Sequence, residues 1–347
     1  MVENSVRDEF RPSFSAETWQ HRQKVNIRAI DLFSGGGGSS WGASKAGVKI
    51  VAAFDRCGLA AKTHKNNFPD SKFFRGKIEN RNLKKLKEGL GRIDLILASP
   101  ECTSHSPAKG NKRPCEKSKN TAFQVIRFAK ALKPRWIVVE NVVSMRRWSR
   151  YEEFKKKLEH QGYQVCEQVL NSMHFGVPQS RRRLFLLCDR KRTPKKIRVA
   201  YKSPPTAKTL VNLNGEYGYT PLYKKNRAKA TLARARRALR RLGLKKPFLL
   251  VYYGSDAAGG WQSLNRPLRT ITTVDRFAIV KRSSHGREMR MLQVPELQTA
   301  MGMKGMSFEH GTRRERIKIL GNAVCPAVMR KVVSSLVKRK ARKTRAR

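Results

Sequence analysis

Short apolar runs recur along the first half of the chain, and stretches with a helical period separate them. Five of the runs predict buried strands, at residues 27–33, 50–55, 93–100, 135–142 and 182–188. Between the third and the fourth, residues 121–134 repeat apolar side chains every three or four positions and end at a proline, which predicts a helix. Strands that are apolar throughout and alternate with helices are typical of a parallel sheet covered on both faces. We therefore expect an α/β domain over residues 27–190.

The pattern changes after residue 190, where a stretch rich in charge and proline predicts a linker into a second region. The segment 226–243 predicts a helix with a narrow apolar stripe under a strongly basic face, formed by Leu232, Ala235, Leu239 and Leu242. We expect this helix either to pack on its own domain with a solvated basic face or to contact phosphates directly. A helix that lies on a membrane surface is a third interpretation.

Further elements complete the predicted division of the chain. Strands are expected at residues 247–254 and 266–280, and helices within 291–303 and 316–328. The predicted organisation is a polar extension, a large domain, a smaller domain, a return to the large domain and a basic tail, at residues 1–26, 27–190, 191–285, 286–336 and 337–347.

Charge narrows the choice of partner. Lysines and arginines number 76 against 25 acidic residues, and the resulting net charge of +51 repels itself unless a polyanion neutralises it. No stretch approaches the ~20 apolar residues of a membrane-spanning helix, and the first 26 residues lack the apolar core of a signal peptide. Nucleic acid is therefore the expected partner, and a membrane is not. A packaging protein would fit the charge equally well, so charge alone does not separate an enzyme from a binding protein.

Six cysteines are scattered without a Cys-x-x-Cys pair, which argues against a zinc ribbon and against a secreted disulfide scaffold. We expect reduced intracellular thiols and no bound metal. Cys102 stands apart because it follows the third apolar run directly and has Glu101 beside it. The other five are expected to be small side chains in the core, namely Cys57, Cys115, Cys166, Cys188 and Cys325.

A glycine-rich turn, DLFSGGGGSSWG, follows the first predicted strand. Such a turn lets the backbone approach a ligand closely and points the N–H groups of the next helix at it. A dinucleotide fingerprint fails because Ser40 and Trp41 occupy the positions that would need its third glycine, and no GK[ST] sequence marks a Walker loop. Asp55 ends the second strand, twenty residues after Gly35, where an acid can bond ribose hydroxyls. A ribose-bearing cofactor without a pyrophosphate fits best, and S-adenosylmethionine is the common example.

Six segments occur in an order that resembles the DNA (cytosine-5) methyltransferase family of bacteria and phages. They are DLFSGGGGSSWG, FDRC, the cysteine after the third apolar run, ENV, QSRRR and LGNAV. Together they span roughly residues 28 to 330 and are far more specific than any one alone. The resemblance implies a Rossmann-like, S-adenosylmethionine-dependent methyltransferase fold, with a mostly parallel sheet, helices on both faces and a smaller target-recognition domain.

The same resemblance implies a cofactor site. Asp55 would hold the ribose and Ile78 would pack on the adenine, while Asn322 would help to close the site from the far end of the chain. The family usually has an aspartate where this chain has Lys77, and a lysine cannot accept a bond from the adenine amino group. The complete set of expected cofactor-binding residues is Phe33, Ser34, Gly35, Gly36, Gly37, Gly38, Asp55, Ile78, Pro100, Asn322 and Val324.

For the reaction, the resemblance makes Cys102 the nucleophile. A thiolate that adds to C6 of cytosine enables C5 to attack an electrophilic methyl group, so covalent catalysis divides one difficult step into easier ones. Glu140 would bond N3 and the exocyclic amine, and Arg181 and Arg183, which strand alternation places on one face, would hold O2 and a nearby phosphate. Glu101 departs from the proline that usually precedes the cysteine, but the variant SPECT resembles a bacterial subset of the family and is read as active.

The expected activity is sequence-specific methylation of cytosine C5 in double-stranded DNA. The enzyme would be either the partner of a cognate restriction endonuclease or solitary, a monomer, and cytoplasmic near the nucleoid of a prokaryotic, phage or viral host. An RNA cytosine-5 methyltransferase is the nearest alternative. A catalytically silent DNA-binding regulator on the same scaffold is another, because Glu101 and Lys77 depart from the family pattern. Residues 191–285 contain no readable base code, so the target sequence is not predicted.

Overall fold

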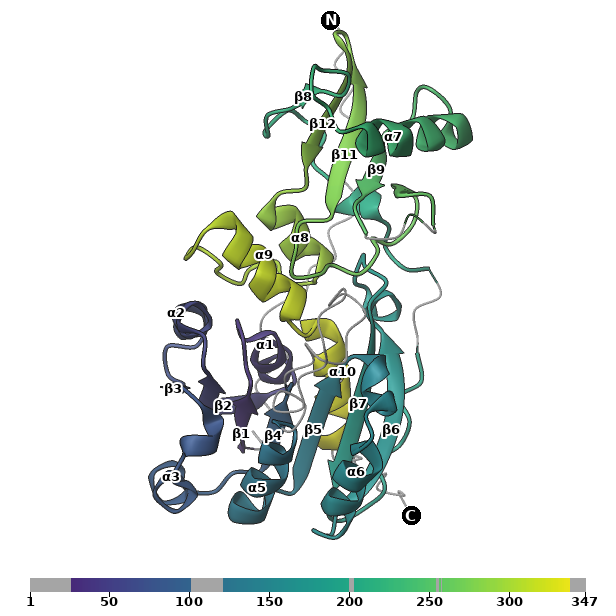
Figure 1. Ribbon diagram of the computed structural model, residues 1–347. Helices are drawn as coiled ribbons and strands as arrows, with labels where there is room; N and C mark the ends of the chain where they lie inside the picture. Colours follow the sequence, from purple (N-terminus) through teal and green to yellow (C-terminus); the bar gives the residue numbers. More distant parts are fainter. Residues whose placement is uncertain (1–25, 101–120, 200–202, 254–255, 257, 338–347) are drawn as a thin grey trace, which may run out of the picture.

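The computed structural model describes residues 26–100, 121–199, 203–253, 256 and 258–337 of the 347-residue chain. Its larger part is a seven-stranded sheet in the order β3-β2-β1-β4-β5-β7-β6, which Figure 1 shows below a separate small sheet. The strands of the large sheet are β1 (Ile27–Leu32), β2 (Val48–Asp55), β3 (Lys72–Arg75), β4 (Leu95–Ala98), β5 (Trp136–Asn141), β6 (Gln164–Asn171) and β7 (Arg182–Asp189).

The first five strands run parallel, and β7 lies antiparallel between β5 and β6. This sheet confirms the predicted Rossmann-like, mostly parallel architecture, and all five predicted strands are present. The apolar pattern does not indicate the reversed direction of β7. It also misses β3, which has only four residues, and β6, in which polar and apolar positions mix.

Helices cover both faces of the large sheet, which explains why its strands are apolar throughout. In β4, Leu95 and Leu97 belong to one core cluster, whereas Ile96 and Ala98 belong to the other. The first cluster includes side chains of α1 (Gly38–Ser44) and α10 (Pro326–Val337), and the second includes those of α3 (Leu83–Leu90), α5 (Phe123–Leu132) and α6 (Tyr151–Glu159). The remaining elements of the large domain are α2 (Gly58–Asn67), η2 (Ile78–Asn80), η4 (Val143–Arg147) and η5 (Ser172–Phe175).

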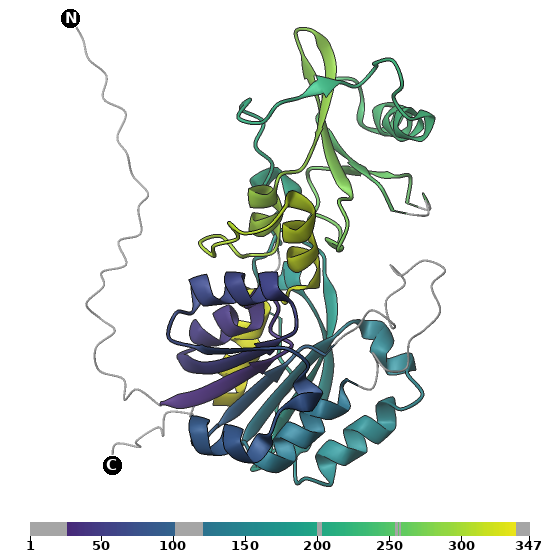
Figure 2. The same cartoon turned by 60° about the vertical axis from the view of Figure 1, so that its left-hand side comes forward.

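The small sheet is antiparallel throughout, in the order β10-β9-β11-β12-β8. After η6 (Ala207–Thr209), its elements are β8 (Thr220–Pro221), α7 (Lys229–Leu242), β9 (Phe248–Val251), β10 (Trp261–Ser263), β11 (Phe277–Ser283) and β12 (Gly286–Met291). The predicted helix 226–243 is α7, and Figures 1 and 2 show it on the outer side of the sheet. The strand predicted at 266–280 forms only from Phe277 onward.

The chain returns to the large domain later than the sequence predicts. The prediction that the chain returns to the large domain at residue 286 is wrong, because β12 pairs with β11 and so belongs to the small sheet. The return instead begins with α8 (Val294–Ala300) and continues through α9 (Arg313–Asn322) to α10. A buried ion pair joins the two parts, since Arg290 on β12 donates to the Glu296 carboxylate on α8 at 2.7 and 2.8 Å.

The cysteines expected in the core are not all buried. Cys166, Cys188 and Cys325 are buried, but Cys57 is exposed where it precedes α2, and Cys115 lies outside the described residues. Among the helices of the described residues, none combines the length and the apolar character needed to cross a membrane.

Candidate active site

The glycine-rich turn connects the carboxyl end of β1 to α1. Three of its residues have φ in the left-handed region that favours glycine, namely Phe33 (60°), Gly35 (51°) and Gly37 (91°). A Cβ on Gly36 would lie 2.7 Å from the Ile319 side chain, and one on Gly38 would lie 2.3 Å from the Val324 carbonyl oxygen. The turn therefore requires glycine both for its conformation and for its close contact with the C-terminal segment.

Asp55 braces this turn from the end of β2. Its Oδ2 accepts a hydrogen bond from the Gly35 N–H at 2.9 Å, and its Oδ1 accepts one from the Cys57 N–H at 2.8 Å. Each carboxylate oxygen can accept a second hydrogen bond, so the side chain retains capacity for ribose hydroxyls. Asp55 thus lies at the glycine turn, as a ribose-binding role would require.

The turn also carries a feature that fits a ligand. Ser34 is buried, and its Oγ has no hydrogen-bond partner within the described part of the chain. A Cβ built on Gly35 would meet nothing within 4 Å, so there is open space beside this residue. A buried hydroxyl without a partner is costly unless a ligand or water satisfies it. The turn therefore offers both a polar group and room for a bound molecule.

The other expected cofactor residues lie in different settings. Ile78 is buried in the core cluster that contains Phe54, and its carbonyl accepts a hydrogen bond from Arg127 Nη2 at 2.7 Å. Lys77, beside it, is exposed. Pro100 is buried at the end of β4, where its carbonyl accepts a hydrogen bond from the Asn141 side chain at 3.2 Å.

From the far end of the chain, the structure brings one residue against the turn and leaves another at the surface. Val324 is 4% exposed and packs with its carbonyl toward Gly38. Asn322, the last residue of α9, is exposed.

Behind the turn lies a buried polar cluster that the sequence interpretation missed. Ser40 Oγ donates to Asp31 Oδ2 at 2.7 Å, the Ser40 N–H donates to the same oxygen at 3.1 Å, and Ser40 Oγ lies 3.3 Å from His64 Nε2. Burial raises the pKa of Asp31 to about 7, against the lowering effect of the Ser40 hydrogen bonds and with a further rise from the Asp55 charge. Burial also lowers the pKa of His64 to about 4. The cluster links β1, α1 and α2 next to the glycine-rich turn.

Glu140 and Arg183 form an ion pair at the ends of β5 and β7. Arg183 Nε lies 3.3 Å from Glu140 Oε1, and their side chains are 16% and 7% exposed. Burial raises the pKa of Glu140, while the positive charges of Arg183 and Arg181 partly oppose the rise. The structure therefore brings together three of the four residues expected to act on the base. The fourth, Cys102, lies outside the described residues.

Arg181 is held in a different way from Arg183. Its Nη1 donates to the Ile271 carbonyl at 2.9 Å, and its Nη2 donates to the Gly321 and Ala323 carbonyls at 2.7 and 2.9 Å. It is buried, whereas Arg182 is exposed, so the predicted alternation of the three arginines is present. Arg181 thus fastens the segment before β11 to the end of α9.

Gln179 completes this fastening and was not singled out from the sequence. Its Oε1 accepts from the Ile271 N–H at 2.9 Å, and its Nε2 donates to the Ala300 carbonyl at 2.9 Å. Together, Gln179 and Arg181 engage both the N–H and the carbonyl of Ile271. Hydrogen-bond partners so distant in sequence leave no local pattern. The one available signal for Gln179 is its place at the start of the polar run QSRRR.

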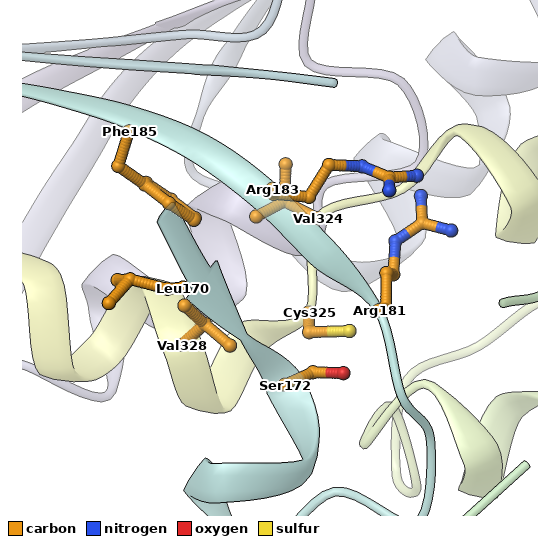
Figure 3. A pocket seen from close by; sticks show the side chains of 8 residues that line it. All are labelled: Leu170, Ser172, Arg181, Arg183, Phe185, Val324, Cys325 and Val328. Carbon is orange, nitrogen blue, oxygen red and sulfur yellow. The ribbon is translucent and has the colours of Figure 1, made fainter. Parts of the chain in front are cut away.

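Figure 3 shows the side chains of Arg181 and Arg183 pointing toward one another at their guanidinium ends, with Cys325 and Ser172 below them in this view. The cavity that these residues line measures about 10 Å³, close to the smallest space that holds a water and far too small for a base. Burial raises the thiol pKa of Cys325, and it also raises those of Cys166 and Cys188. These three buried cysteines are therefore poor nucleophiles near neutral pH.

Solved structures resemble the whole described fold. A DNMT2 from Spodoptera frugiperda superposes with a TM-score of 0.65 at 17% sequence identity, and covers 90% of this chain and 100% of its own. An Escherichia coli prophage protein described as a putative DNA modification methyltransferase superposes with a TM-score of 0.63 at 18% identity, and covers 90% of this chain and 98% of its own. At this level of identity, the likeness supports the fold alone.

Sequence relatives place the chain more narrowly. The type II methyltransferase M.DdeI of Desulfomicrobium norvegicum is 32% identical over 167 residues, which is 46% of this chain and 40% of that protein. M.XorII of Xanthomonas oryzae pv. oryzae is 34% identical over 176 residues, 48% of this chain and 41% of that protein. The match thus spans about two fifths of the length of these curated relatives. The model of the C-5 cytosine-specific DNA methylase family matches residues 27–338. The chain therefore belongs to the C-5 cytosine-specific DNA methylase family.

Proposed function

We propose that this protein transfers a methyl group from S-adenosylmethionine to C5 of a cytosine in double-stranded DNA, within a specific target sequence. The observation that carries the proposal is the buried Glu140–Arg183 pair at the ends of β5 and β7, next to the carboxyl end of β4 that leads to Cys102. In open α/β sheets, ligands bind beyond the carboxyl ends of the strands. The description of the matching family, C-5 cytosine-specific DNA methylase, supports DNA as the substrate.

The glycine turn supports the cofactor assignment. Ser34 offers a buried hydroxyl, Gly35 leaves room beside it, and Asp55 has acceptor capacity for ribose hydroxyls. When bound, S-adenosylmethionine would supply an electrophilic methyl group for C5. Lys77 is exposed and does not compete with a ligand for these groups, although it cannot replace the aspartate acceptor usual at this position.

Cys102 would provide the nucleophile. Its thiolate forms a bond to C6, and the π electrons of the C5=C6 bond shift toward C5, which becomes nucleophilic. Negative charge that develops on the ring would be relieved at N3 by a proton from the Glu140 carboxyl, whose pKa burial raises against the opposing charges of Arg183 and Arg181. Release of Cys102 requires that a base remove the C5 proton, so that the electron pair re-forms the C5=C6 double bond and the thiolate leaves. The N3 proton then returns to the Glu140 carboxylate, which restores the enzyme.

The base must leave the duplex to reach these groups, since the N3 edge of a paired cytosine is not accessible to a buried glutamate. Arg183 would contact O2 of the extruded base, because its guanidinium adjoins Glu140. Arg181 would support this arrangement from behind through its three backbone carbonyl contacts. A monomer acting on one cytosine at a time is sufficient for this chemistry.

A labelled-methyl assay tests the proposal. The protein is incubated with S-adenosylmethionine carrying a labelled methyl group and with either duplex DNA or tRNA, and the modified bases are mapped. We expect label at C5 of cytosines in one DNA sequence, and protection of that sequence from a restriction endonuclease with the same target. Label in RNA alone would overturn the DNA assignment, and DNA binding without transfer would favour a silent regulator.

A pair of cysteine variants tests the covalent step. Cys102→Ala should abolish transfer and leave duplex binding within about twofold of the wild type, while Cys57→Ala, at an exposed cysteine, should retain activity. Duplex DNA that carries 5-fluorocytosine should trap the wild type and the Cys57 variant as a covalent complex, because fluorine at C5 cannot leave as a proton does. Transfer by the Cys102 variant at the wild-type rate would contradict the mechanism.

A further inference from the structure

The small domain carries a strongly charged surface that the methyl-transfer site does not use. Between residues 224 and 246 there are eleven lysines and arginines and no acidic residue. This segment contains α7 and the turn that follows it. A concentration of one charge on a single element needs either local neutralisation or a polyanionic partner.

The packing of α7 directs this charge outward. Ala235 and Ala238 are buried against the small sheet in a cluster with Phe248 and Leu250 of β9. The alternate residues of β9, Leu249 and Val251, belong instead to the cluster shared with the large domain. Therefore α7 covers the face of the small sheet opposite the large domain, and its basic residues form the outer surface.

The arginines of α7 fall into two groups. Arg234 and Arg237 both bind the Asp256 carboxylate, at 2.9 and 2.6 Å, and so are neutralised within the domain. Arg236, Arg240 and Arg241 are exposed, and none of them has a hydrogen-bond or ion-pair partner in the described part of the chain. The Asp256 carboxylate is thus already shared by two arginines, and the outward group is left for an external anion.

A groove lies among the outward side chains. Arg236, Leu239, Arg240 and Leu244 line an open groove of about 470 Å³, and Leu244 is 64% exposed. Arg236 and Arg240 are one helical turn apart, so they flank the leucine floor on the same side of the helix. A charged rim over an apolar floor matches a sugar–phosphate backbone, in which anionic phosphates alternate with deoxyribose rings. A purely acidic peptide would not use the leucines.

Stabilisation of the helix itself does not account for the pattern. Arg240 and Arg241 lie in the last turn of α7, where cations are favourable. Arg236 lies before that turn, and Lys245 and Lys246 follow the helix end, yet they continue the same exposed surface. The charge therefore extends beyond what the helix terminus requires.

We infer that the outward face of α7, formed by Arg236, Arg240, Arg241 and the groove at Leu244, binds the phosphate backbone of duplex DNA outside the target bases. The inference rests on the proposed function for the identity of the polyanion. Such a surface adds affinity without sequence preference, because phosphate contacts carry no base information. It would lengthen the DNA segment held by the enzyme beyond the sequence that it reads.

Salt dependence of DNA binding tests this surface. The variant Arg236→Gln/Arg240→Gln/Arg241→Gln is compared with Lys84→Gln/Lys85→Gln/Lys87→Gln, which removes three exposed charges from α3 at the opposite end of the molecule in Figure 1. Binding to a 40-base-pair duplex is measured from 50 to 300 mM salt. The slope of log K against log salt should become shallower by about 2 to 3 in the α7 variant, at ~0.9 per lost phosphate contact, and stay at the wild-type value in the α3 variant.

Further measurements separate the possible failures. Once the target has been mapped, the α7 effect should disappear on a duplex trimmed to the target sequence, and kcat at saturating DNA should be unchanged. A slope equal to that of the wild type on the long duplex would overturn the inference. Loss of binding to phosphatidylserine vesicles with an unchanged DNA slope would also overturn it and would identify a membrane surface instead. If no variant or wild type transfers methyl groups but the α7 slope still changes, the proposed function fails and the DNA-binding surface stands.

Discussion

Replacement of Arg181 by glutamine should destabilise the whole molecule, because this side chain joins segments that are far apart in sequence. Its guanidinium donates three hydrogen bonds, to the carbonyls of Ile271, Gly321 and Ala323, and the residue is only 3% exposed. The glutamine is shorter and has one amide group, so it can satisfy at most part of this set. At least one buried carbonyl would then lose its partner.

The expected loss can be estimated from these contacts. Hydrogen bonds that involve a charged donor contribute about 1.5–3 kcal/mol each, and three of them are not additive within one network. Removal of the positive charge also removes its desolvation cost, which offsets part of the loss. We therefore expect the free energy of unfolding to fall by about 3–5 kcal/mol, at the upper end of single substitutions.

Urea denaturation of matched variants measures this effect. Arg182→Gln is the control, because it changes the same residue type one position away, at an exposed side chain. The Arg182 variant should unfold within about 0.5 kcal/mol of the wild type. If the Arg181 variant also stayed within that range, Arg181 would not be fastening the two segments, and a role confined to the bound base would be the better explanation.

The remaining predictions concern the glycine-rich turn, the Asp31 cluster behind it, and Glu140. Asp31 has a pKa raised to about 7, so between about pH 4 and pH 7 it holds a proton in the folded state and loses that proton on unfolding. The free energy of unfolding should therefore fall by ~1.4 kcal/mol per pH unit from this group as the pH rises through that range. The variant Asp31→Asn should flatten that part of the curve of stability against pH. A curve of the same slope in the variant would refute this. Gly38→Ala should weaken cofactor binding by at least tenfold in calorimetry, because the added Cβ would lie 2.3 Å from a backbone oxygen. The control Gly89→Ala, on an open face of α3, should bind the cofactor normally and unfold at a slightly higher temperature. Equal cofactor affinity in both variants would contradict the packing. Glu140→Gln should lower kcat by a factor of about 10²–10³ with little change in duplex affinity. In the wild type, kcat should fall as the pH rises through the raised pKa of this carboxyl. An identical pH profile in the variant would exclude Glu140 as the proton donor.

The large sheet could be predicted because burial on both faces leaves a clear sequence signal. Strands such as β4 are apolar at every position, and no turn or polar face interrupts them. β6 gave no such signal, since it is an edge strand with Glu167 and Gln168 among its apolar residues. The direction of β7 depends on how the chain connects through β6, and local composition does not encode that connection.

The site could be predicted only where function fixes residue types in short motifs. The glycine turn, Glu140 and Arg183 belong to such motifs, and the structure brings the latter two within 3.3 Å. The carbonyl partners of Arg181 could not be predicted, because backbone groups carry no residue identity. The Asp31 cluster was missed for a related reason: its members come from three elements, and each alone is compatible with an ordinary core position.

The contact between Gly38 and Val324 has a consequence for synthesis of the protein. The glycine-rich turn leaves the ribosome well before Val324, which lies 286 residues after Gly38 in the sequence and forms one wall of the turn. A nascent or truncated chain that lacks the last helices would present an open, unfinished turn. Closure of the turn would then wait until the late segment docks, so a ligand that needs this wall would not bind an incomplete chain.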